Sequence, residues 1–239
     1  MPSVDVLAFA PHPDDAELLC GGTLAKLARE GRRTAIIDLT HGEMGTRGSV
    51  EIRAAEAERA AQILGVAVRE NLGLPDSRLE NTTATRLQLV SVIRRLRPLV
   101  VIAPAPPGRH PDHRVAAQLV RDACFLSGIR KVDLKSEPHR PRKLLHAIAY
   151  REDHVKPTFV VDISNDFETK LAAVACYASQ FEGVIQAGEV YPTGAPLADV
   201  IRHQSAHYGS LIRCLYGEPF WTHETMRVDD VLALQVETF

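Results

Sequence analysis

VDVLAFAPHPDDAE, residues 4–17, joins a short apolar segment directly to a polar loop that is rich in histidine and aspartate. The apolar part, residues 4–10, is shorter than a typical helix. Its nearly continuous hydrophobicity is typical of a strand that is buried on both faces of a parallel sheet. The stretch therefore predicts a central strand whose carboxyl end leads into the loop at residues 11–17.

The same alternation of apolar runs and helix-length segments continues along the chain. This order predicts an α/β fold, with a Rossmann-like, doubly wound and mostly parallel sheet that carries helices on both faces. We expect one domain over residues 1–239, with a core of about 1–180 and a C-terminal elaboration of about 181–239. Strands are expected at 4–10, 34–40, 68–74, 99–105, 144–150 and 158–164, and helices at 16–30, 51–64, 85–96, 112–127, 167–179 and 197–215.

Two polar loops are expected to meet at one edge of this sheet. In doubly wound sheets, ligands bind beyond the carboxyl ends of the strands, where the strand order reverses. With strand order 3-2-1-4-5, the first and fourth strands are neighbours there, and the loops that leave them are PHPDDAE (11–17) and PPGRHPDHR (106–114). The Gly- and Pro-containing segment Gly183–Pro196 is expected to form a further loop over this site, and residues 128–142 a polar excursion.

Composition and charge exclude several classes of protein. The chain has 28 Lys and Arg against 30 Asp and Glu, and no run of like charges that could follow a phosphate backbone, so nucleic acid is not an expected partner. The N-terminal segment lacks the basic and long apolar regions of a signal peptide or membrane span, which predicts a cytoplasmic protein. The cysteines are scattered and are interpreted as packing residues: Cys20, Cys124, Cys176 and Cys214.

Each of the two polar loops carries a pair of metal-binding residue types at the same spacing. His12 and Asp15 are three residues apart, as are His110 and His113, so each pair can present two side chains on one face of a helical turn. Two imidazoles and one carboxylate suit Zn²⁺ with one position left for water, which is the arrangement of a catalytic zinc site. We therefore predict that His12, Asp15 and His113 bind one Zn²⁺ per subunit.

The other polar residues of the two loops are candidates for proton transfer. Asp14 lies beside the ligands but points elsewhere, which suits a general base for water. His110, held protonated by Asp112, would stabilise a developing oxyanion or protonate a leaving amine. The opposite allocation, with His110 as the ligand and His113 as the acid, fits the spacing equally well. Either loop alone could also be no more than a capped helix start, but their joint occurrence on neighbouring strands favours a site.

In these motifs the chain resembles the LmbE/PIG-L family of zinc-dependent deacetylases, and within it the BshB1 branch of bacillithiol-pathway enzymes, which remove acetyl from N-acetylglucosaminyl malate. The likeness rests on APHPDDAE (10–17) and HPDH (110–113). It extends over GGTLAKLAREG (21–31), DLTHGEMGTRGSVEIRAAEAERAAQILG (38–65), NLGLPD (71–76), SGIRK (127–131), PHR (138–140), FVVDIS (159–164), YASQF (177–181) and YGEPF (216–220).

This resemblance implies zinc on His12, Asp15 and His113, Asp14 as the base and His110 as the charge-stabilising histidine. It also implies that Arg53 and Arg140 line the substrate pocket, where guanidinium groups suit hydroxyls or a carboxylate. A homo-oligomer such as a hexamer is expected by analogy. The chain departs from the family where some relatives carry a pocket tyrosine, for which Tyr191 is the candidate and Leu197 occupies the equivalent position. It also has Arg213 and Cys214 where relatives favour Gly-Val.

Other functions fit the sequence less well. The pair Gly21-Gly22 suggests a nucleotide-binding module, but its spacing is not G-x-G-x-x-G and two aspartates would repel phosphate, so the glycines are interpreted as helix packing positions. A metalloprotease is disfavoured because no H-E-x-x-H is present. A catalytically inert metal scaffold would be expected to lack the base. The alternatives kept are a deacetylase of another N-acetylglucosamine-containing substrate and a thiol-conjugate amidase, with Fe²⁺ or Co²⁺ as substitutes for zinc.

Overall fold

A computed structural model describes residues 3–132, 134–149, 155–181 and 196–236. Its centre is a seven-stranded sheet in the order β3-β2-β1-β4-β5-β7-β6. The first five of these follow the predicted order and are parallel, whereas β7 is antiparallel to both of its neighbours. The strands are β1 (Val6–Ala10), β2 (Thr34–Thr40), β3 (Val68–Leu74), β4 (Val100–Pro104), β5 (Lys143–Ala147), β6 (Phe159–Asp162) and β7 (Gly217–Trp221).

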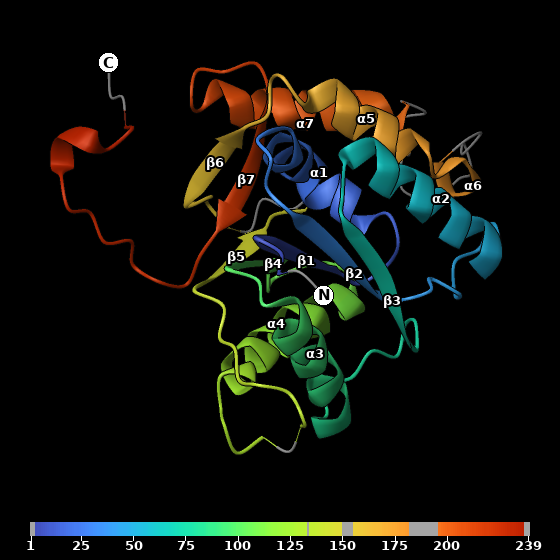
Figure 1. Ribbon diagram of the computed structural model, residues 1–239. Coiled ribbons are helices and arrows are strands. Elements are labelled where there is room, and N and C mark those ends of the chain that lie inside the picture. The colour runs from blue at the N-terminus through green and yellow to red at the C-terminus, as the bar shows by residue number, and fades with distance from the viewer. Residues whose placement is uncertain (1–2, 133, 150–154, 182–195, 237–239) are drawn as a thin grey trace.

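Helices cover both faces of the sheet, as predicted (Figure 1). Helices α3 and α4 pack together on one face, and α1, α2 and α5 lie on the other. The strands supply a core on each face because alternate residues of a buried strand point in opposite directions. The helices are α1 (Asp15–Arg29), α2 (Val50–Leu64), α3 (Thr83–Leu96), α4 (Pro111–Ser127), α5 (Phe167–Ala175), α6 (Ala178–Phe181) and α7 (Leu197–Ser210), with a short 3₁₀ turn at Val231–Ala233.

Local sequence signals explain where several helices begin and end. Ser49 caps α2 through a hydrogen bond from the Ile52 amide, and Gly65 ends that helix in the left-handed conformation. Thr82 and Thr85 form a reciprocal capping box at the start of α3. The segment predicted as one helix over 167–179 is divided into α5 and α6, and the helix predicted over 197–215 ends at Ser210.

The C-terminal part differs most from the prediction. The sequence predicts no separate strand in the region of β7, yet β7 inserts between β5 and β6. Beyond it, residues 222–236 lead away from the body of the molecule (Figure 1). Among the described residues, no helix is both long and apolar enough to cross a bilayer.

Candidate active site

The two histidine-bearing loops meet where β1 and β4 end, as the strand order predicts. His12 and Asp15 come from the loop after β1 and the start of α1, and His113 lies in the first turn of α4. One ligand atom from each of the three residues lies within 4.8 Å of the others. Asp15 Oδ2 is 3.0 Å from His12 Nδ1 and 3.1 Å from His113 Nε2. The three side chains therefore form one cluster that could hold a single metal ion.

The backbone of the first loop fixes this geometry. Asp15 Oδ2 also accepts a hydrogen bond of 2.9 Å from the His12 amide, which closes the loop on itself. Asp14 has φ 120° and ψ −26°, a conformation that L-residues rarely adopt. Such backbone conformations cost about 1–3 kcal/mol and cluster at functional sites. Asp14 makes no capping hydrogen bond to α1, which argues against a role limited to helix capping.

His110 lies at the edge of the same cluster. Its ring centroid is 4.9 Å from that of His12 and 5.4 Å from that of His113. A second group of potential ligands, His12, His110 and Asp112, also has its atoms within 4.8 Å, so geometry alone leaves both allocations of the two histidines open.

The Asp112 carboxylate was expected to keep His110 protonated, but the structure gives the two residues a different contact. His110 Nδ1 accepts a hydrogen bond of 3.2 Å from the Asp112 amide and so caps α4. A nitrogen that accepts a hydrogen bond carries no proton, which leaves the proton of a neutral ring on Nε2. Burial, together with the neighbouring His12 and His113, lowers the pKa of His110 below its ordinary value. His110 is therefore a neutral imidazole with one donor nitrogen, and it lies in the site while it caps the helix.

The carboxylate of Asp112 instead organises the loop that follows β3. It accepts hydrogen bonds from the Ser77 amide at 2.7 Å and the Leu79 amide at 3.4 Å, and lies 3.3 Å from His12 Nε2. Asp76 from this loop is 3.1 Å from the same nitrogen. Asp76 is the residue that sequence reasoning missed, although it ends the motif NLGLPD at the carboxyl end of a predicted strand.

His12 is surrounded by more negative charge than its own ring can balance. Burial disfavours a charged imidazole, but hydrogen bonds to Asp112, Asp15 and Asp76 outweigh it and raise the pKa of His12 to about 12. His12 thus keeps its proton when no other positive charge neutralises the carboxylates of Asp15, Asp76 and Asp112. A divalent cation would balance the same charge, and imidazole nitrogen with carboxylate oxygen is a donor set that Zn²⁺ accepts. The residues present fit a metal ion.

Asp14 lies beside the cluster and forms an ion pair with Arg53, a buried residue of α2. Asp14 Oδ2 accepts a hydrogen bond of 2.7 Å from Arg53 Nη2. The same guanidinium donates to the Pro13 carbonyl and to the Gly42 carbonyl, at 3.1 Å each. Gly42 has φ +68°, and a Cβ there would lie 2.1 Å from Arg53 Nη1, so only glycine allows this approach. Arg53 thus lies beside the cluster, where it supports Asp14 and the loop. Its expected contact with the substrate stays a prediction.

Burial raises the pKa of Asp14 to about 7, whereas the positive charge of Arg53 lowers it. A base must be deprotonated to act, so activity that depends on Asp14 is lost as the pH falls below its pKa. Removing the charge in Arg53→Met raises this pKa further. We expect the acidic limb of the pH–rate profile to move to higher pH, as measured by kcat/KM across the pH range. Arg86→Met is the control, because it removes a half-exposed partner of Asp122, and it should leave the acidic limb in place. An acidic limb that does not move in Arg53→Met would contradict the effect of Arg53 on the pKa of Asp14.

Arg140 does not reach the cluster. Its Nη2 donates to the Phe125 carbonyl at 2.9 Å, and its guanidinium lies 4.7 Å above the Phe125 ring. Phe125 is in the last turns of α4, whereas His113 is in the first, which separates them by roughly 18 Å along the helix. Arg140 therefore lies away from the cluster, and its expected place in the substrate pocket stays a prediction. Tyr191 and most of Gly183–Pro196 lie outside the described residues, and Leu197 is the first residue of α7.

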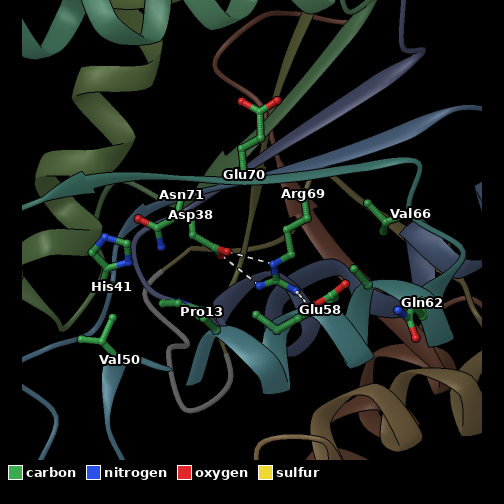
Figure 2. A pocket seen from close by; sticks show the side chains of 13 residues that line it. Pro13, Asp38, His41, Val50, Glu58, Gln62, Val66, Arg69, Glu70 and Asn71 are labelled. Carbon is green, nitrogen blue, oxygen red and sulfur yellow. Dashed lines mark hydrogen bonds and ion pairs between the residues drawn. The ribbon is translucent and has the colours of Figure 1, made fainter. Parts of the chain in front are cut away.

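A cavity of about 440 Å³ lies beside the loop that follows β1, between α2 and the strands β2 and β3 (Figure 2). It borders the site through Pro13 and Asp38. Arg69 holds Asp38 with two hydrogen bonds, of 2.8 and 3.0 Å, which fixes the end of β2 beside Pro13 (Figure 2). His12, Asp15 and His113 are not among the residues that line this cavity, so it is not the place where a substrate would meet the cluster.

Comparison with known proteins places this chain among sugar-amide hydrolases. A diacetylchitobiose deacetylase from Thermococcus kodakarensis is 35% identical over 229 residues, which cover 89% of this chain and 80% of that protein. A Bacillus anthracis protein described as "Probable N-acetyl-alpha-D-glucosaminyl L-malate deacetylase 2" is 27% identical over 235 residues. The match covers 91% of this chain and 94% of that protein. The crystal structure of the conserved protein TT1542 from Thermus thermophilus has a TM-score of 0.84 and 41% identity, and covers 95% of this chain and 98% of that one.

These similarities define the class of the protein as an amidohydrolase, because the relatives with named activities above are deacetylases. The PIG-L family, described as GlcNAc-PI de-N-acetylase, matches residues 7–124, which include both histidine-bearing loops. The chain belongs to this family. The Rossmann-like fold predicted from the sequence agrees with that of the solved relative.

Proposed function

We propose that the chain removes the N-acetyl group from an N-acetylglucosaminide with the help of one zinc ion held by His12, Asp15 and His113. The observation that carries this proposal is the convergence of these three ligand atoms beside a buried carboxylate that does not belong to the ligand set. Names of the relatives support the substrate class, since they include enzymes for diacetylchitobiose and for N-acetylglucosaminyl malate.

A divalent metal bound there would polarise the acetamide carbonyl and make a nearby water more acidic. Asp14 is the base that removes a proton from the attacking water. Its Oδ2 is held by Arg53, which orients the carboxyl group while leaving a second oxygen that can take a proton.

His110 supports the negative charge that develops on the amide oxygen. Its Nδ1 is occupied by the Asp112 amide, so Nε2–H is the donor that a neutral ring offers to the oxyanion. As the C–N bond breaks, the proton taken by Asp14 passes to the departing nitrogen. The products are acetate and a free amino sugar, so that the atoms of one amide and one water are accounted for.

The substrate that best fits the sequence motifs is N-acetylglucosaminyl malate, as in bacillithiol biosynthesis. Diacetylchitobiose is the competing substrate, because a deacetylase of that disaccharide is also similar over most of the chain. A thiol-conjugate amidase is the more distant alternative. These three choices share the hydrolysis of an amide and differ in the groups that the amide joins.

The test is a panel assay with N-acetylglucosaminyl malate, diacetylchitobiose, an inositol conjugate and a thiol conjugate, with and without chelator. It measures acetate release from the glucosaminides and the freed amine from the thiol conjugate. We expect release from a glucosaminide that stops with chelator and returns with Zn²⁺. Release that is unaffected by thorough metal removal would contradict the proposal. The expected homo-oligomer is tested on the same preparation by light scattering coupled to size-exclusion chromatography.

A further inference from the structure

Helix α1, which carries Asp15, is broken in its middle. Cys20 has φ −146° and ψ 19°, values outside the helical region, although residues on both sides are helical. In an unbroken helix the Gly22 amide would donate to the Leu18 carbonyl. At this break both groups bond to side chains from elsewhere in the fold. The residues before the break, Asp15 to Leu19, thus form a short first segment that carries Asp15 and follows directly from Asp14.

A buried ion pair occupies the gap. Lys170 of α5 donates to the Leu18 carbonyl at 2.9 Å, and Glu218 of β7 accepts from the Gly22 amide at 2.9 Å. Lys170 Nζ and Glu218 Oε1 are 2.6 Å apart, so the pair replaces the missing helical hydrogen bond with a chain of three polar contacts. The side chains are 4% and 1% exposed, which makes this one of the most buried charge pairs among the described residues.

The charges of Lys170 and Glu218 are each of the sign that the nearby helix end stabilises. The Lys170 ammonium lies at the carboxyl end of the first segment, where a positive charge is stabilised, and the Glu218 carboxylate lies at the amino end of the second, where a negative charge is stabilised. Glu218 also accepts from the Thr23 amide at 2.7 Å and the Thr23 hydroxyl at 2.6 Å. Gly22 allows no side chain here, because a Cβ would lie 2.7 Å from Ile163 Cδ1.

We infer that Lys170 and Glu218 are positioning residues for the metal site, which they reach through α1. The inference rests on the proposed function, since it takes Asp15 as a metal ligand. The hydrogen bonds of the Glu218 carboxylate go to α1 and to Lys170. The pair fixes the first segment of α1 relative to the sheet, and this segment sets where the Asp15 carboxylate meets His12 and His113. Outer residues that orient metal ligands change affinity by about 10–100-fold when they are removed.

The test compares Glu218→Gln with a matched buried charge far from the site. Glutamine keeps the shape of the side chain but offers only one acceptor oxygen to the Gly22 amide, the Thr23 groups and Lys170. Arg94→Gln is the control. Arg94 is 3% exposed and donates to the carbonyls of Ser127, Ile129 and Ser136, at the end of α4 opposite His113.

The zinc dissociation constant is measured by competition with a chromophoric chelator, and the absorption spectrum of the Co²⁺ form reports ligand geometry, both well below the melting temperature. We expect Glu218→Gln to weaken zinc binding by about 10–100-fold and to change the Co²⁺ spectrum. Arg94→Gln should lower the melting temperature and leave both readouts unchanged. Wild-type zinc affinity in Glu218→Gln, or an equal loss in Arg94→Gln, would overturn the inference.

A milder variant covers the case in which Glu218→Gln does not fold. Thr23→Ala removes a methyl group and the hydroxyl hydrogen bond to Glu218, and it keeps the amide hydrogen bond. It should weaken zinc binding by a smaller factor in the same direction, and unchanged affinity would overturn the inference. Zinc binding by the wild-type chain distinguishes a failure of this inference from a failure of the proposed function. If the wild type binds no zinc, the proposed metal site is wrong, whereas wild-type binding with unaffected variants contradicts only the role of the ion pair.

Discussion

Asp14→Asn is expected to lower kcat by about 10²- to 10⁴-fold while zinc remains bound. An amide has nearly the shape of the carboxyl group but cannot take a proton from water. Asparagine also tolerates the left-handed backbone region better than most residues, which suits a position with φ 120°. Steady-state deacetylation of the preferred glucosaminide measures kcat, and metal analysis of the purified variant measures occupancy.

The stability of the variant must be known before its activity is interpreted. The substitution leaves the buried Arg53 without its ionic partner, so a loss of stability is expected in addition to the loss of catalysis. Arg53→Met, which breaks the same pair from the other side, is the matched control. If Asp14→Asn is far less active than Arg53→Met at equal folded fraction, the carboxylate acts in the reaction. Near wild-type turnover in Asp14→Asn would contradict its role as base.

The parallel part of the fold could be predicted because its signals are local. Strands β1, β2 and β4 are apolar and buried on both faces, so their sequence alone distinguishes them from the helices between them. Their order then places the two histidine-bearing loops at one edge. In contrast, β7 has Pro219 at its centre, and its position depends on pairing with β5 and β6 rather than on its own hydrophobicity.

The clustering of the candidate residues could be predicted where two residue types recur at a fixed spacing, and less so where a single residue acts across the fold. His12, Asp15 and His113 belong to paired motifs. Asp76 is a lone carboxylate 64 positions from His12, and only the packing of the loop after β3 brings them together. The break at Cys20 was also missed, because the apolar spacing of residues 16–30 continues through it.

His113→Ala and His110→Ala together are expected to decide which histidine binds the metal. We expect His113→Ala to weaken zinc binding by more than the roughly 100-fold limit typical of outer residues, because it removes one of three ligands. We expect His110→Ala to keep zinc and to lose about 10²- to 10³-fold in kcat, since it removes a donor to the oxyanion.

The His113 ring lies 3.1 Å from Asp15 Oδ2, the carboxylate that both His12 and a metal ion would share. His110 has one nitrogen committed to the Asp112 amide, so it can offer only Nε2, and in a neutral ring that nitrogen carries the proton. A metal ligand must present a free lone pair, which favours His113 over His110. Zinc dissociation constants and kcat of both variants, measured on folded protein, give the answer. The reverse pattern, with metal lost in His110→Ala and retained in His113→Ala, would select the second group of ligands: His12, His110 and Asp112.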